Sequence, residues 1–160
     1  QGDIKFLNVL RDMGCTIADE ADGVKVSGTA LDGYPGMDIS MKDFSDQTMT
    51  MAALAPFAQG PTLIRNIGHI RFQETDRIHA ILTELTRMGI ACEEGPEYDG
   101  IRIMPGEVKK CAVETYDDHR MAMAFTLTGL RTGKITIVNP ECCRKTFENY
   151  FELMEELYDS

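Results

Sequence analysis

Apolar residues recur at intervals of three or four positions in two separate stretches of the chain. The first stretch contains Phe6, Val9, Leu10 and Met13, and the second contains Ile78, Ile81, Leu82, Leu85 and Met88. This spacing places the apolar side chains on one face of an amphipathic helix. Each stretch ends in Met-Gly, and a glycine directly after the last turn commonly ends a helix. The pattern therefore predicts two helices that bury one face and end at the same dipeptide.

Two short stretches that can form strands follow each predicted helix and are separated by an Asp-Gly pair. Asp-Gly adopts the positive φ angles that a tight turn between antiparallel strands requires. The sequence therefore predicts two β-hairpins closed by tight turns, the first with strands at 15–19 and 24–28 and the second with strands at 90–95 and 101–104.

Two further stretches, residues 47–59 and 119–131, are rich in Ala and Met and carry almost no charge inside. Such composition predicts helices that are buried on several sides. Each is followed by a glycine and then by a predicted strand, at 62–67 after the first helix and at 134–138 after the second. Pro56 should interrupt the first of these helices, because proline lacks the backbone N–H and collides with the preceding turn. A last helix is predicted at 147–158.

The two halves of the chain follow one plan. The two Met-Gly pairs are 75 residues apart, Asp46 and Asp118 are 72 apart, and Asn66 and Asn139 are 73 apart. Each copy contains helix, strand, strand, strand, helix and strand, which is a βαβαββ unit once its origin is shifted. We therefore predict an α/β (α+β) fold of two repeated units and the start of a third. Because the chain begins with Gln1 and ends inside the third copy, we expect residues 1–160 to be one partial domain of a longer protein.

Composition narrows the class of protein further. With 43% hydrophobic residues, the 160-residue chain can form a core, and its net charge of −10 disfavours nucleic acid and anionic membranes as partners. No apolar run approaches the roughly 20 residues that a membrane helix needs. The five cysteines include no Cys-x-x-Cys pair, so they suit neither a disulfide framework nor a zinc site. We expect reduced thiols and a cytoplasmic location.

Candidate chemistry is concentrated at the predicted starts of helices, in four polar clusters at 45–46, 74–77, 117–120 and 144–146. Helix capping is a sufficient explanation for some of the residues, namely Ser45, Asp46, Thr75 and Asp117. It does not explain the cations, because the helix dipole disfavours positive charge in a first turn. A shared anionic ligand would explain Arg77, Arg120 and Lys145, which can bind carboxylate or phosphate beside helix N-termini.

Two carboxylates next to these cations could act on such a ligand. Asp46 and Glu74 are candidates for a general base and a general acid, provided that they lie within hydrogen-bond reach of the reacting atoms. We considered a metal site at Asp117, Asp118 and His119, where a histidine follows two carboxylates, and we predict no metal and no organic cofactor.

Four motifs at these positions closely resemble one enzyme family. SDQTMT at 45–50, RNIGHIRFQETDRI at 65–78, YDDHRMAMAF at 116–125 and NPECCRKTFENYF at 139–151 are similar to the carboxyl-terminal part of EPSP synthases, the 3-phosphoshikimate 1-carboxyvinyltransferases of the shikimate pathway of aromatic amino acid biosynthesis. The resemblance implies the inside-out α/β barrel of enolpyruvyl transferases, with two domains of three βαβαββ units each. It also implies that the amino-terminal substrate-binding domain is absent here and is needed to complete the site.

The resemblance also implies a reaction and a set of roles. These enzymes transfer the enolpyruvyl group of phosphoenolpyruvate to the 5-hydroxyl of shikimate 3-phosphate and release phosphate, without metal or cofactor. By this resemblance, Asp46 is the base at the attacking hydroxyl and Glu74 is the acid that protonates the methylene carbon. The remaining roles are phosphoenolpyruvate binding by Arg77, Arg120 and Lys145, and shikimate 3-phosphate binding by Asp46, His69 and Gln73. Glyphosate, the inhibitor of the family, is expected in the same cationic pocket.

The chain departs from the family pattern at a few positions. Gln73 stands where the family usually has Lys, so a neutral amide replaces a charge that is expected to contact the shikimate moiety. We hypothesise that Arg144 supplies the missing cation. Two alternatives to the EPSP synthase hypothesis remain open: an enzyme similar to UDP-N-acetylglucosamine 1-carboxyvinyltransferase, and a non-catalytic anion-binding module of the same fold. Under the EPSP synthase hypothesis, we expect the isolated chain to be inactive.

Overall fold

The computed structural model describes residues 2–28 and 33–159, and it contains the two repeated units that the sequence predicts. The first unit consists of α1 (Phe6–Asp12), β1 (Thr16–Glu20), β2 (Gly23–Ser27), β3 (Asp38–Ser40), α2 (Thr48–Leu54) and β4 (Thr62–Arg65). The second consists of α3 (Arg77–Arg87), β5 (Cys92–Gly95), β6 (Gly100–Ile103), β7 (Cys111–Val113), α4 (His119–Thr132) and β8 (Ile135–Ile137). The last helix, α5 (Tyr150–Asp159), begins the third unit.

Several element boundaries differ from the sequence prediction. The helix expected at 47–59 is divided at Pro56, as predicted, into α2 and a 3-10 turn at Ala55–Phe57. The second hairpin forms, but the tight turn predicted for it is wrong, because a 3-10 turn at Pro96–Tyr98 lengthens its loop. The helix predicted from 147 begins only at Tyr150, because residues 144–146 form a turn and residue 147 has no helical assignment.

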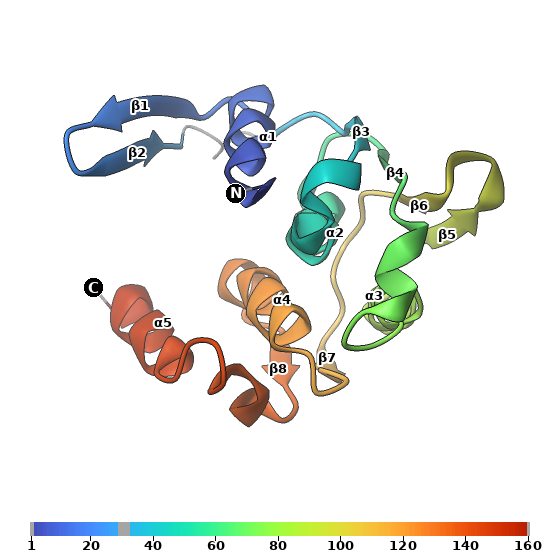
Figure 1. Cartoon of the computed structure of the whole chain (residues 1–160). Coiled ribbons are helices and arrows are strands. Elements are labelled where there is room, and N and C mark those ends of the chain that lie inside the picture. The colour runs from blue at the N-terminus through green and yellow to red at the C-terminus, as the bar shows by residue number, and fades with distance from the viewer. Residues whose placement is uncertain (1, 29–32, 160) are drawn as a thin grey trace.

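The sheets join strands from different copies of the repeat. Strands β3 and β4 of the first unit pair in parallel, and β4 also pairs antiparallel with β6 of the second unit, which gives a four-stranded sheet of order β3-β4-β6-β5. The hairpin β1–β2 and the parallel pair β7–β8 form two separate two-stranded sheets. The three sheets lie on different sides of the molecule with α2 and α4 between them (Figure 1).

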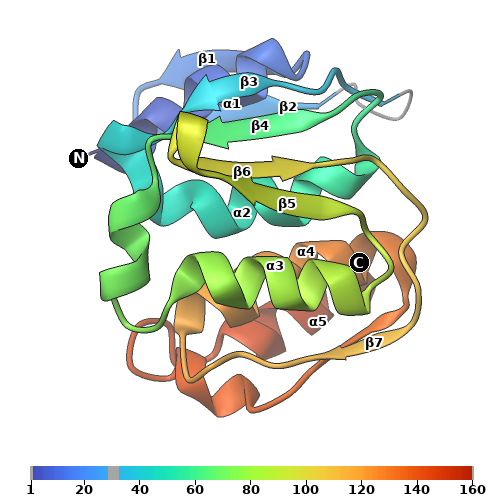
Figure 2. The ribbon, with the colours of Figure 1, turned by 90° about the vertical axis from the view of Figure 1, so that its right-hand side faces the viewer.

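One main hydrophobic core connects the two units. It includes Met49 and Met51 of α2, Ile81 and Leu85 of α3, and Phe125 of α4, all of which are almost fully buried. The methionines therefore fill the core, as their spacing in buried helices predicts. Helices α2 and α3 lie beneath the four-stranded sheet (Figure 2). Helix α5 packs on α4 through a smaller cluster, in which the Tyr150 hydroxyl donates to the Met123 carbonyl at 3.1 Å.

None of the described helices is both long and apolar enough to cross a membrane. All five cysteines are free thiols, and Cys142 and Cys143 are buried. Burial is the main cause that raises the pKa of Cys143 to about 12, so this thiol is protonated at neutral pH.

Candidate active site

The guanidinium of Arg77 lies at the centre of the predicted site and is almost completely buried, with 1% of the residue exposed. Its Nε donates to Asp118 Oδ2 at 2.7 Å, and its Nη2 donates to Glu74 Oε2 at 2.7 Å and to Asp118 Oδ1 at 3.4 Å. Its Nη1 donates to Asp46 Oδ1 at 3.1 Å and to the Gln73 side-chain carbonyl. Side chains of the protein therefore accept a hydrogen bond from each of the five N–H groups of this arginine.

The surroundings of Arg77 keep it charged. Burial lowers the pKa of its guanidinium, but the hydrogen bond and charge of Asp118, together with the charges of Glu74 and Asp46, raise this pKa above its ordinary value. A buried arginine with three carboxylate partners is a fixed cation. Removing it would leave buried Asp118 without a counter-ion, which costs far more than losing an exposed ion pair.

The repeat explains how these residues meet. Asp46 and Asp118 occupy matching positions before the buried helices α2 and α4, and these two helices pack against each other. Asp118 is the N-cap of α4, where it accepts from the Arg120 backbone N–H at 2.9 Å. Arg77 is the first residue of α3 and reaches both aspartates. One arginine therefore bridges two equivalent carboxylates from successive units.

Arg120 approaches the same cluster from the first turn of α4. Its Nη2 lies 2.9 Å from Asp46 Oδ2, and its Nη1 lies 3.9 Å from Asp3 Oδ2. Asp46 thus binds Arg77 with one oxygen and Arg120 with the other. Unlike Arg77, Arg120 is about a quarter exposed, with 28% of its side chain accessible to solvent. Its guanidinium can therefore contact a ligand without local unfolding of the protein.

Two open cavities share Asp46 and Arg120. The first, of about 260 Å³, is also lined by Thr50, His119, Thr146 and Tyr150. The second, of about 280 Å³, is also lined by Lys42, Ser45 and Gln73. The Asp46–Arg120 pair consequently separates two spaces in which two small molecules could lie next to each other.

The other predicted site residues lie at the edge of this cluster. Glu74 is exposed, and its second carboxylate oxygen, Oε1, has no hydrogen-bond partner within residues 2–28 and 33–159. His69 Nε2 lies 2.8 Å from the Ser45 hydroxyl oxygen. Lys145 is exposed in the turn at 144–146, and its neighbour Thr146 lines the first cavity. The structure thus brings Asp46, Gln73, Glu74, Arg77 and Arg120 together and leaves His69 and Lys145 outside the ion-pair cluster.

Two expectations about the helix starts are wrong. The side chains that cap α3 and α4 belong to Asp76 and Asp118, each one residue after the predicted caps Thr75 and Asp117, while Ser45 and Asp46 lie inside the 3-10 segment Lys42–Gln47. Thr75 and Asp117 lose the role because the helices begin one residue later than their polar clusters suggest. Lys145 does not begin a helix either, since α5 starts at Tyr150.

Sequence reasoning did not assign a site role to Asp118 and His119. Asp118 holds Arg77 and caps α4, and His119 lines the first cavity. The 72-residue match between Asp46 and Asp118 is the signal that could have identified Asp118 as a second partner of the same arginine. Arg144, proposed to replace the charge missing at Gln73, forms an exposed ion pair with Glu141 at 2.7 Å.

Metal binding has no support from the described part of the chain. No group of three His, Cys, Asp or Glu side chains within residues 2–28 and 33–159 is arranged to hold a metal ion. Asp118 is engaged by Arg77, and exposed Asp117 adopts a left-handed backbone conformation with φ of 55°.

Solved structures define the class of this fold. EPSP synthase from Acinetobacter baumannii superimposes with a TM-score of 0.83 at 26% sequence identity, over 97% of this chain and 39% of that chain. The enolpyruvyl transferase NikO from Streptomyces tendae superimposes with a TM-score of 0.70 at 21% identity, over 97% of this chain and 35% of that chain. The chain therefore has the enolpyruvyl transferase fold, which confirms the predicted fold class.

The family follows from the sequence comparisons. Residues 1–154 match the family model of EPSP synthase (3-phosphoshikimate 1-carboxyvinyltransferase). The 3-phosphoshikimate 1-carboxyvinyltransferase of Nostoc punctiforme is 52% identical over 151 residues, which are 94% of this chain and 34% of that protein. The chloroplastic enzyme of Brassica napus is 43% identical over 98% of this chain and 31% of its own length. The chain belongs to the EPSP synthase family and spans about a third of the length of these relatives.

Proposed function

We propose that this chain supplies the phosphoenolpyruvate-binding half of an active site that transfers an enolpyruvyl group to the 5-hydroxyl of shikimate 3-phosphate and releases phosphate. The observation that carries the proposal, beside family membership, is the bridging of Arg77 and Arg120 by Asp46 where two cavities meet. Two anionic substrates that react with each other must lie side by side, and two neighbouring cavities permit this. A carboxylate between the cavities can accept the proton that leaves the attacking hydroxyl.

Each step of the reaction has a candidate group. Asp46 accepts the proton of the 5-hydroxyl while the hydroxyl oxygen bonds to C2 of phosphoenolpyruvate. Glu74 donates a proton to C3, which gives a tetrahedral adduct. In the second half, the C2–O bond to phosphate breaks, the Glu74 carboxylate takes a proton from C3, which restores the double bond, and Asp46 gives its proton to the leaving phosphate. Arg77 orients Glu74 by donating to its Oε2 at 2.7 Å, which leaves Oε1 free to exchange a proton with the substrate.

The cations have unequal access to a ligand. Arg120 and Lys145 are accessible, so we assign them to the anionic groups of phosphoenolpyruvate. Arg77 already donates five hydrogen bonds, so it can bind the same substrate only if a ligand oxygen displaces Asp46, Gln73 or Glu74 as an acceptor. On the shikimate 3-phosphate side we assign Asp46, His69 and Gln73, of which Asp46 and Gln73 line the second cavity.

Local charge explains why the isolated chain should not turn over. Three carboxylates, those of Asp46, Glu74 and Asp118, surround the guanidiniums of Arg77 and Arg120. Substrates with several negative charges therefore need further cations, which we expect from a complementary domain that closes over the site. The free thiols are consistent with a reducing compartment such as the cytoplasm.

A chimeric enzyme tests the proposal. The chain replaces the matching third of the Nostoc punctiforme enzyme, and phosphate release is measured with phosphoenolpyruvate and shikimate 3-phosphate. We expect turnover within about tenfold of the unmodified relative, because one pocket contact contributes at most a few kcal/mol, and no turnover from the chain alone. A folded chimera without turnover would contradict the proposal. Turnover with UDP-N-acetylglucosamine in place of shikimate 3-phosphate would instead favour the alternative substrate.

A further inference from the structure

Two consecutive residues before α4 have left-handed backbone conformations that residues other than glycine rarely adopt. Tyr116 has φ of 56° and Asp117 has φ of 55°. Such residues are strained in this region, so contacts with the surrounding protein must hold the segment there. Directly after the pair, Asp118 caps α4 and binds Arg77, and two residues later Arg120 lines both cavities. The strained pair therefore leads straight into the end of α4 that carries the site.

Helix α3 holds this segment on both sides of the strained residues. The carboxylate of Glu84 accepts from the Glu114 backbone N–H at 3.2 Å and from the Tyr116 hydroxyl at 2.9 Å. Seven residues earlier on the same helix, Arg77 donates to Asp118 at 2.7 Å. The distance along α3 between its two contact residues is thus matched to the left-handed turn that lies between their partners.

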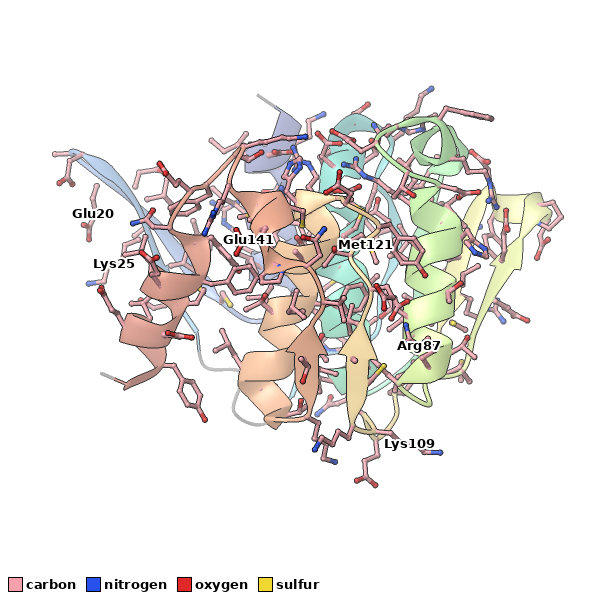
Figure 3. All side chains as sticks on the ribbon, turned by 90° about the horizontal axis from the view of Figure 1, so that it is seen from below. Glu20, Lys25, Arg87, Lys109, Met121 and Glu141 are labelled. Carbon is pink, nitrogen blue, oxygen red and sulfur yellow. The ribbon has the colours of Figure 1, made fainter. Side chains whose placement is uncertain are left out.

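The acceptor of the Tyr116 hydroxyl is a completely buried carboxylate. Arg87 donates to the two oxygens of Glu84 at 3.0 Å and 2.9 Å, and Figure 3 shows Arg87 on the side of α3 that faces β7. Burial, followed by the hydrogen bond and the charge of Glu84, raises the pKa of Tyr116 to about 12. The hydroxyl therefore keeps its proton at neutral pH and remains a donor to Glu84.

The first repeat unit has apolar residues at the corresponding positions. Phe44 precedes Tyr116 by 72 residues, and Val9 precedes Glu84 by 75 residues. Val9 is buried in the main core, and Phe44 packs against that core with φ of −145°, outside the left-handed region. Apolar side chains are thus sufficient for packing at this place in the unit, whereas a buried carboxylate has a desolvation cost. The polar pair of the second unit therefore has a task other than filling the core.

We propose that Tyr116 is a positioning residue of the active site, whose hydrogen bond to Glu84 fixes where α4 begins. The start of α4 in turn determines how Asp118 meets Arg77 and how Arg120 meets phosphoenolpyruvate. The identity of this ligand rests on the proposed function, whereas the placement of Asp118 does not. Tyr116 lines neither cavity, so it acts through these residues and not by contact with the substrate.

The arrangement that this hydrogen bond excludes is a helix that begins one residue earlier. Asp117 and Asp118 are equally suitable residue types for an N-cap, but a capping residue has an extended backbone, which the left-handed Asp117 lacks. If Asp117 became the cap, the backbone of Asp118, now extended with φ of −106° and ψ of 113°, would become helical. Its carboxylate would then turn away from its present contact with Arg77. The contact at Tyr116 therefore selects one of two adjacent caps.

Hydrogen exchange of the Arg77 side chain tests this placement without a substrate. The Arg77 Nε–H, which donates to Asp118, is followed by NMR in the full chain. Its rate is divided by that of the backbone amide of Phe125, which lies in the buried middle of α4 and exchanges only on unfolding. We expect Tyr116→Phe to raise this ratio by about tenfold or more, because Asp118 is no longer held in place.

A second tyrosine provides the matched control. The Tyr34 hydroxyl donates to the carbonyl of Leu54, at the end of α2 that lies away from Asp46. Burial raises the pKa of Tyr34 to about 12, despite the nearby charge of Arg131, so this hydroxyl is also a protonated donor. Tyr34→Phe removes the same group and one hydrogen bond, and it should change the exchange ratio by less than about twofold.

Kinetics of the chimeric enzyme test the effect on substrate binding. Tyr116→Phe should raise the KM for phosphoenolpyruvate by about threefold to tenfold, and Tyr34→Phe should leave it within about twofold. A loss of stability alone would not change KM, because the molecules that remain folded bind normally. Glu84→Gln keeps a carbonyl acceptor for the hydroxyl and should raise KM less than Glu84→Leu. Adding Glu84→Leu to Tyr116→Phe should change KM by no more than about twofold, because the hydrogen bond is already lost.

The outcomes separate this proposal from the proposed function. Unchanged exchange of Arg77 in Tyr116→Phe, or an unchanged KM in an active chimera, would overturn the role of Tyr116. Equal effects of Tyr116→Phe and Tyr34→Phe would also overturn it, because they would show a general loss of stability. A folded chimera without turnover would contradict the proposed function instead, and the exchange of Arg77 would still decide whether Tyr116 places Asp118.

Discussion

Arg77 and Arg120 share the carboxylate of Asp46, yet their surroundings differ sharply. Arg77 is buried, and all five of its N–H groups donate to protein side chains. Arg120 is partly exposed, contacts Asp46 at 2.9 Å and lines both cavities. Two arginines in one site can therefore serve different purposes, one holding the carboxylates in place and the other meeting the ligand.

Replacing the buried arginine should have the largest effect on folding. Arg77→Met leaves Asp118 buried without its counter-ion and should lower the free energy of unfolding of the chain by roughly 3–5 kcal/mol, measured by urea denaturation. The control Arg102→Met removes an exposed pair with Glu93, at 3.9 Å, and should cost less than about 1 kcal/mol. Adding Asp118→Asn to Arg77→Met keeps an N-cap side chain, removes the unpaired charge and should restore part of the loss. Equal losses of unfolding free energy for Arg77→Met and Arg102→Met would show that the buried position of Arg77 has no special importance for stability.

Replacing the accessible arginine should affect binding instead of stability. In the chimeric enzyme, Arg120→Met should raise the KM for phosphoenolpyruvate by about tenfold or more, because a charge-assisted contact to the substrate is lost. The unfolding free energy should change by less than about 1 kcal/mol, since the pair with Asp46 is partly solvated. Steady-state kinetics and urea denaturation of the same preparation provide both readouts. A large loss of stability with an unchanged KM would show that Arg120 has the structural task.

A change at Gln73 should have the smallest effect and sharpens the contrast on the side of the second substrate. Gln73→Lys in the chimera adds a cation beside the second cavity and should tighten binding of shikimate 3-phosphate by about threefold to tenfold. Gln73→Met, which removes the amide without adding charge, is the matched control and should not tighten it. Isothermal titration measures both variants. Equal affinity of the Lys and Met variants would mean that charge at this position has no part in binding.

Local sequence patterns predicted the helices and hairpins of this fold better than they predicted which strands pair with each other. Helical spacing and the repeat period were sufficient for the helices, the hairpins and the division at Pro56. They could not show that β6 of the second unit joins β4 of the first, because both hairpins have the same pattern and only packing selects the pairing. The N-caps of α3 and α4 were predicted one residue too early for a related reason. Asp76 and Asp118 are residue types as suitable for an N-cap as Thr75 and Asp117, so the sequence does not distinguish between them.

The site was predictable to a similar extent. Residue types and family motifs pointed to Asp46, Glu74, Arg77 and Arg120, which the structure brings together. The complete enclosure of Arg77 was not predicted, because it depends on Asp118, a residue 41 positions away whose part in the site is indicated only by its repeat match to Asp46. The position of Lys145 was missed because its cluster, residues 144–146, forms a turn instead of the start of a helix.

In the proposed enolpyruvyl transfer reaction, Glu74, held by Arg77, performs the proton transfer at C3. The most direct measurement is the rate of phosphate release by the chimera carrying Glu74→Gln, compared with Glu97→Gln at an exposed site. We expect Glu74→Gln to lower kcat by about 100-fold or more, because a general acid is lost, and Glu97→Gln to retain full activity. Near-full turnover by the Glu74→Gln enzyme would show that Glu74 is not the acid in this reaction.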